Sequence, residues 1–155
     1  MTNDIQTGHP YFSLRPARET ESAQIKALIR LVGINPMDLD WKRFVVAVNE
    51  QDQMLGCGQL KPHGTDILEL ASLAVYPEHQ GKGVGRALIE HLLKNSPRPL
   101  YLMCVSHNGP MYEKFGFIPV SVDQMPKYFR RMKNVFDVAD VFRKSGEELL
   151  VMKLG

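Results

Sequence analysis

The chain has few cysteines, almost no net charge and no long apolar run, and each shortage argues against a class of protein. Its 155 residues contain only Cys57 and Cys104, which lie far apart without the paired spacing of a zinc or redox motif. We therefore expect two buried thiols and no metal. Charged residues make up 23% of the chain and the formal net charge is +2, so the overall charge does not indicate binding to nucleic acid.

The chain also lacks the apolar segments that direct proteins to membranes. Residues 1–10 are polar, without the core of a signal peptide, and the longest apolar runs are far too short to span a bilayer. We expect a cytoplasmic protein with no membrane partner. A hydrophobic content of 44% in 155 residues is enough for one ordinary core, so we expect a single domain over 1–155 with a flexible start at 1–10.

The hydrophobic pattern predicts an α/β protein. Apolar segments with polar turns between them predict antiparallel hairpins, whereas the near-continuous apolar run at 100–105 is typical of a strand covered on both faces. The sheet is therefore mixed, mostly antiparallel, with one parallel crossover and flanking helices. The expected elements are strands at 11–15, 44–48, 54–60, 67–75, 100–105 and 147–154, helices at 20–32, 83–94 and 111–115, and a helical turn at 37–41.

An additional amphipathic helix is expected at 126–144, inside an insertion at 121–146 that precedes the final strand. Its aromatic and aliphatic residues recur at helical spacing, and Gly146 ends it. Such a stripe packs against the protein's own core, covers a sheet edge, walls a substrate site or forms a homodimer contact. The sequence leaves these four alternatives open.

A glycine-rich segment at 80–86 lies between a predicted strand and a predicted helix. Free backbone N–H groups and the helix dipole make such a junction a site for phosphate. No Gly-Lys-Ser/Thr follows a four-residue gap, and the sixth position of the dinucleotide fingerprint is Arg86 or Leu88. Neither an NTPase nor a dehydrogenase is therefore favoured. A glycine-rich turn without a ligand is the alternative at this point.

Residues 73–89 resemble motif A of the GNAT acetyltransferase superfamily. Its pattern, Gln/Arg-x-x-Gly-x-Gly/Ala, is met by Gln80, Gly83 and Gly85, and residues 112–117 resemble the family's downstream Tyr-x-x-x-Gly-Phe segment. The resemblance covers roughly 14–120 and leaves the final third unmatched. It implies a GNAT fold and acetyl-CoA as the acyl donor, without a metal.

The resemblance also implies which residues bind coenzyme A. The pantetheine arm would pair with the backbone of Leu73, Ala74 and Val75. The family usually has an asparagine seven residues before its tyrosine, but Val105 occupies that place here, and Asn108 stands four residues before Tyr112. Asn108 contacts the pantetheine or serves as a cap or turn residue. The pyrophosphate would lie on the segment formed by Gln80, Gly81, Lys82, Gly83, Val84, Gly85 and Arg86.

Two residues are candidates for catalysis. Tyr112 matches the family's tyrosine that protonates the coenzyme A thiolate; its alternative role is that of a half-buried packing aromatic. Glu69, six residues before Val75, matches the glutamate that deprotonates the amine in some family members. Its alternative is a glutamate on the solvent face of a strand.

These residues predict direct acetyl transfer in a ternary complex to a primary amine, carried by a small-molecule or peptide acceptor that the sequence does not identify. No cysteine or serine has a base at a recognisable spacing, so we expect no covalent acyl-enzyme. Two alternatives stand beside this prediction. One is a non-catalytic acyl-CoA-binding or regulatory module, and the other is an interaction protein that uses the helix at 126–144.

Overall fold

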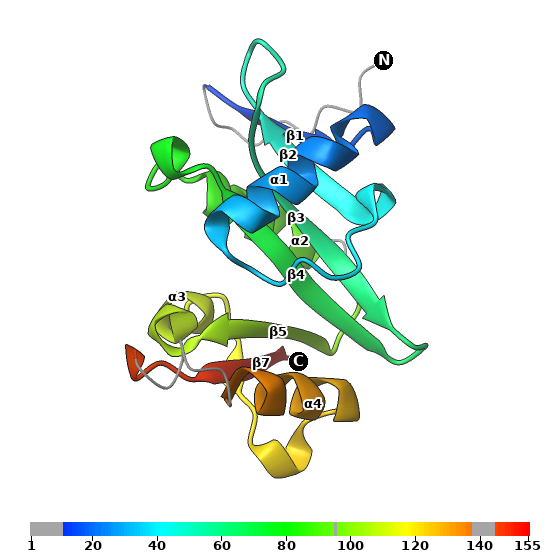
Figure 1. The fold of residues 1–155 in the computed structure, drawn as a ribbon, viewed down its shortest axis with the longest axis vertical. Helices are drawn as coiled ribbons and strands as arrows, with labels where there is room; N and C mark the ends of the chain where they lie inside the picture. The colour runs from blue at the N-terminus through cyan, green and yellow to red at the C-terminus, as the bar shows by residue number, and fades with distance from the viewer. Residues whose placement is uncertain (1–10, 95, 138–144) are drawn as a thin grey trace. The chain divides into compact units, whose positions relative to one another are not determined.

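A computed structural model describes residues 11–94, 96–137 and 145–155, which form two compact units (Figure 1). The first unit contains the chain up to Lys61 together with Ala71–Ser96, and the second contains Pro62–Leu70 together with Pro97–Gly155. Strands β3 (Met54–His63) and β4 (Ile67–Val75) therefore each contribute residues to both units.

In the first unit, helices cover both faces of a small antiparallel sheet. Strand β2 (Phe44–Val48) pairs with β1 (Ser13–Pro16) on one side and with β3 on the other. Because side chains alternate along a strand, Phe44 and Val46 pack with helix α1 (Ser22–Val32). Ala47 on the opposite face packs with helix α2 (Val84–Lys94).

The second unit is built on strand β5 (Leu100–Val105). Strand β5 runs parallel to the first part of β4 and antiparallel to β7 (Leu149–Leu154), which also pairs with the short β6 (Ile118–Pro119). Helix α3 (Gly109–Glu113) follows β5, and helix α4 (Lys127–Asp137) precedes β7. The buried ring of Phe129 anchors α4 to Tyr101 and Val151.

The strand order β1-β2-β3-β4-β5-β7-β6 confirms the expected mixed, mostly antiparallel sheet flanked by helices. Cys57 and Cys104 are both buried free thiols, as expected. The flexible start expected at 1–10 lies outside the described residues, and so does the last part of the expected helix, 138–144. Among the helices that are described, none is both long and apolar enough to cross a membrane.

The helical turn expected at 37–41 is wrong. Asp38 has a left-handed backbone with φ 55°, which interrupts any helix there, and the turn instead spans Trp41–Arg43. The side chain of Asp40 accepts a hydrogen bond from the Lys42 backbone N–H at 3.1 Å, so the turn begins after its capping residue. Strand β3 also extends to His63, three residues past the expected end.

Glycine is required at position 56, where β3 passes close to β4. A Cβ on Gly56 would stand 2.8 Å from the backbone oxygen of Ala74, and within 3.3 Å of methyl carbons of Val75 and Val84. The carbonyl belongs to the main chain, so it cannot move aside as a flexible side chain does.

We predict that Gly56→Ala lowers the free energy of unfolding by about 1–3 kcal/mol, the usual cost of overpacking. Chemical denaturation measures it. Gly85→Ala is the matched control, because its Cβ would meet Val75 at an ordinary 3.7 Å. A Gly56→Ala protein as stable as the wild type would contradict the close approach.

The buried thiols predict weaker stability at alkaline pH. Burial raises the pKa of Cys57 to about 12 and that of Cys104 to about 11. A thiol in the unfolded chain ionises near ~8.5. The unfolded state therefore loses protons first as the pH rises, and the free energy of unfolding falls above this value. Urea titrations at pH 7 and pH 10 measure this change. The free energy of unfolding should fall less between the two pH values in Cys57→Ala than in the wild type. An equal fall in both proteins would disprove the contribution of Cys57.

Candidate active site

The glycine loop joins β4 to α2 in the first unit. Gly81 and Gly83 have φ values of 76° and 88°, in the left-handed region that favours glycine. The first helical hydrogen bond runs from the Ala87 N–H to the Gly83 carbonyl at 3.0 Å. The N–H groups of the preceding residues, Val84 to Arg86, therefore have no partner within the helix. This is the arrangement of backbone donors that binds phosphate.

Side chains on either side hold the loop in place. The Tyr11 hydroxyl donates to the Lys82 carbonyl at 2.8 Å, and the Gln80 amide donates to the Val75 carbonyl at 3.2 Å. Gln80 thus ties the loop back to the end of β4. The side chains of Lys82 and Arg86 are exposed, so they add positive charge where the free N–H groups lie.

Strand β4 changes direction just before the segment predicted to bind pantetheine. Ser72 has a left-handed backbone with φ 57°, which costs about 1–3 kcal/mol for a residue other than glycine. The buried Gln59 amide donates to Ser72 Oγ at 2.8 Å, and the Cys57 thiol contacts the Ser72 carbonyl at 3.7 Å. These contacts fix the backbone that leads into Leu73, Ala74 and Val75. Serine rather than glycine stands at this position, so the left-handed backbone could not be predicted from the sequence.

Tyr112 lies on α3 in the second unit, partly buried. Burial, with a smaller contribution from nearby Cys104, raises the pKa of Tyr112 to about 12. Its ring meets that of Phe117 edge to face, with centroids 6.2 Å apart. The phenol therefore keeps its proton at neutral pH, as a proton donor must.

Asn108 ends a short turn that leads into α3. It is the N-cap residue of α3, but its side chain makes no capping hydrogen bond, so its place at the end of the turn is what the structure shows. The neighbouring Ser106 hydroxyl and the His107 ring both bond to the Glu147 carboxylate, and the hydrogen bond from Ser106 is the main cause that lowers the pKa of Glu147. These bonds fix the turn to the chain that enters β7.

Glu69 is buried, which overturns its alternative as a solvent-facing residue. Its side chain is 4% exposed, and His63 Nε2 lies 2.7 Å from Glu69 Oε1. Glu69 stands in register with Tyr101 of β5, on the face that α4 covers. The His63 ring in turn stacks on Tyr128 of α4, with centroids 3.6 Å apart. Sequence reasoning missed His63 because the packing of α4 depends on contacts distant in the chain.

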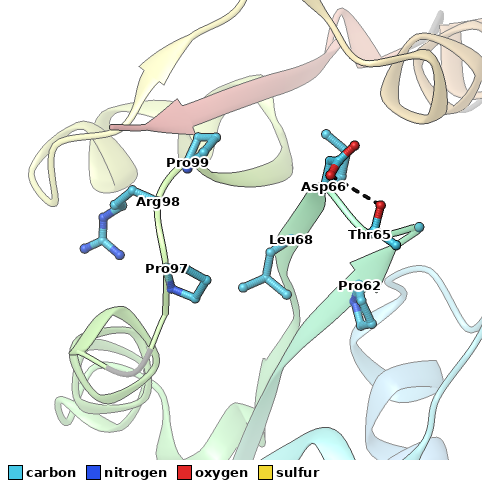
Figure 2. Close-up of a pocket in the computed structure, with 9 residues that line it drawn as sticks. Pro62, Thr65, Asp66, Leu68, Pro97, Arg98 and Pro99 are labelled. Carbon is cyan, nitrogen blue, oxygen red and sulfur yellow. Dashed lines mark hydrogen bonds between the residues drawn. The ribbon is translucent and has the colours of Figure 1, made fainter.

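A pocket of about 400 Å³ lies at the amino-terminal ends of β4 and β5 (Figure 2). Leu68 points between the β3–β4 turn and the prolines before β5, and Thr65 bonds to the adjacent Asp66 at 3.3 Å. None of the candidate residues lines it. Over the described part of the chain, no three His, Cys, Asp or Glu side chains gather in a way that could hold a metal.

The structure thus places the candidate residues in two groups. The glycine loop and Leu73 to Val75 are continuous in the first unit, whereas Glu69, Asn108 and Tyr112 belong to the second. Among described residues, no hydrogen bond or ring contact joins Tyr112 to Glu69.

The chain is similar in sequence to known acetyltransferases. Residues 40–119 match the model of the acetyltransferase (GNAT) domain. The mycothiol acetyltransferase of Renibacterium salmoninarum is 30% identical over 122 residues, which cover 71% of this chain and 35% of that protein. The chain thus spans about a third or less of the length of the mycothiol acetyltransferases that it matches.

Solved structures share the fold. N-acetylglutamate synthase from Neisseria gonorrhoeae, in complex with coenzyme A and N-acetyl-glutamate, superposes with a TM-score of 0.70 at 23% identity over 95% of this chain and 36% of that one. The ribosomal-protein-S18-alanine N-acetyltransferase of Escherichia coli has a TM-score of 0.64 at 19% identity, with 92% of both chains covered. The match to the family model extends over half of the chain and includes motif A, the glycine loop and Tyr112. The chain therefore belongs to the GNAT acetyltransferase family.

Proposed function

We propose that this protein transfers an acetyl group from acetyl-CoA to a primary amine, directly and in a ternary complex. The observation that carries the proposal is the left-handed glycine loop, which opens α2 with free N–H groups and exposed cationic side chains. The similar proteins carry the names mycothiol acetyltransferase, N-acetylglutamate synthase and ribosomal-protein-S18-alanine N-acetyltransferase, so both small molecules and a protein occur in these names. The acceptor here is a primary amine of either kind, and we place the reaction in the cytoplasm.

The donor site uses backbone more than side chains. The loop from Gly81 to Arg86 would hold the pyrophosphate on its N–H groups, and the strand from Leu73 to Val75 would pair with the pantetheine arm. The open space around Gly81 supports this fit, because nothing lies within 4 Å of where its Cβ would be.

Tyr112 is proposed to protonate the coenzyme A thiolate. With a reference thiol pKa of ~8.5, a phenol of pKa about 12 would transfer its proton at a cost near ~5 kcal/mol. The surroundings change this comparison. Burial raises the pKa of the nearby Cys104 thiol to about 11, and the transfer needs surroundings that raise the pKa of the coenzyme A thiol in the same direction.

Glu69 is proposed to act on the acceptor side of the reaction. A lysine-type amine with a pKa of ~10.4 must be deprotonated at a cost of ~4.6 kcal/mol at pH 7, whereas an α-amine near ~8 costs only ~1.4 kcal/mol. A base therefore matters most for the more basic amine. The burial of Glu69 against His63 supports a role in proton chemistry.

The first prediction of this proposal concerns donor binding. Lys82→Glu places an anion beside the proposed pyrophosphate and should weaken acetyl-CoA binding at least tenfold in calorimetry, while Gly83→Glu should abolish it. Lys94→Glu is the matched control, because it makes the same charge change at the far, exposed end of α2. Equal affinities for Lys82→Glu and Lys94→Glu would contradict the loop site, and a folded wild type that binds no acetyl-CoA would refute the proposed function.

The second prediction concerns Tyr112. Tyr112→Phe removes only the hydroxyl, so acetyl-CoA affinity should stay within about twofold of the wild type. Turnover with an amine found by screening should fall ~10²-fold or more, as expected for loss of a general acid. Unchanged turnover would show that Tyr112 only packs α3 against the sheet.

A further inference from the structure

The His63 imidazole lies between a carboxylate and an aromatic ring in the second unit. Its Nε2 atom is 2.7 Å from Glu69 Oε1, and its ring stacks on Tyr128 at a centroid distance of 3.6 Å and an interplanar angle of 22°. Phe129 meets the same ring edge to face at 5.9 Å. Side chains from β3, β4 and α4 therefore fix both the position and the plane of the imidazole.

The two partners differ in their access to solvent. The Glu69 side chain is 4% exposed and the His63 side chain 13%. Both side chains are therefore largely buried, and the imidazole keeps the larger exposed fraction.

The second nitrogen of the ring is available for chemistry. Because a carboxylate accepts hydrogen bonds, the neutral ring carries its proton on Nε2 and donates it to Glu69, which leaves a lone pair on Nδ1. Within the described residues, no hydrogen bond involves His63 Nδ1.

We propose that His63 Nδ1 is the base that takes the proton of the acceptor amine, with Glu69 as the positioning residue that orients and polarises the ring. The inference rests on the proposed function and reassigns the base from Glu69 to His63. Tyr128 of α4 sets the plane of the ring, so α4 forms one wall of the acceptor side.

The protons balance as follows. The acceptor ammonium gives one proton to His63 Nδ1, and the freed lone pair forms the N–C bond with the acetyl carbonyl carbon. The C–S bond breaks with its electron pair on sulfur, and Tyr112 protonates that thiolate. The nitrogen loses a second proton, which returns to Tyr112 through solvent, and His63 releases its own. The net products are the amide, coenzyme A and one proton.

Further side chains surround Phe129, which touches this ring. Tyr101 of β5 stacks on Phe129 at 5.2 Å, and the Lys153 ammonium of β7 lies 5.9 Å from the Tyr101 ring. Glu69 contributes from β4 and Tyr128 from α4. Among these described groups, Glu69 makes a hydrogen bond with the His63 ring.

The test uses variants that separate the base from its hydrogen bond. His63→Gln keeps an amide N–H near the position of Nε2 and so can still bond to Glu69, but it lacks the Nδ1 lone pair. Acetylation of Nα-acetyl-lysine amide, a lysine-type amine, should fall 10²–10⁴-fold, and that of alanine amide, an α-amine, much less. Acetyl-CoA affinity should not change. His91→Gln on α2 is the matched control and should leave both rates unaltered.

Nitrogen NMR of the imidazole tests the same assignment without an acceptor. In the wild type, the neutral His63 ring should show a protonated Nε2 and a bare Nδ1. Glu69→Gln should remove this tautomer preference. A neutral ring that carries its proton on Nδ1 would overturn the proposal even if neither amine is acetylated.

The outcomes also separate this proposal from the proposed function. A folded wild type that fails to bind acetyl-CoA would refute the function as a whole. Intact binding, with equal losses for both amines or no loss in His63→Gln, would refute only the role of His63, and would leave the Glu69 pair as a contact that holds α4.

Discussion

The hydrogen bond from the buried Gln59 amide to Ser72 is the interaction on which the arrangement of β4 depends. It stabilises a left-handed residue in a strand, where a serine is otherwise unfavourable by about 1–3 kcal/mol. Upstream of Ser72, β4 carries Glu69 and pairs with β5; downstream, it leads into the glycine loop. A regular strand would present both segments on one continuous pleat. The left-handed Ser72 interrupts that pleat. One strand can therefore pair with β5 before Ser72 and lead into the glycine loop after it.

Tyr112 and His63, the two candidate proton carriers, differ in their surroundings. Tyr112 lies close to Cys104, and burial keeps both groups protonated. His63 lies beside the Glu69 carboxylate, with Nε2 at 2.7 Å from Oε1. Alternation along β5 places Tyr101, near Glu69, and Cys104, near Tyr112, on opposite faces of that strand.

How much the sequence predicts depends on how local each feature is. The glycine loop and the bounds of β2, β4 and β5 were predicted because glycines, turn residues and apolar periodicity act over a few residues. The turn near Trp41 was misplaced because the Asp40 cap decides where it begins. The burial of Glu69, its pairing with His63 and the left-handed Ser72 could not be predicted, since each depends on side chains from another strand or from α4.

The passage of β3 and β4 through both units has a consequence for the order of synthesis. The tip of this hairpin, Pro62–Leu70, belongs with a unit whose other strands are translated later. On the ribosome, α1, β2 and β3 can begin to pack while Glu69 still lies in water, its carboxylate hydrated. Burial of that charge waits for Leu100–Val105 and then for α4 to emerge. Glu69 of the nascent chain therefore stays exposed to water until β5 and α4, which enclose it, have been synthesised.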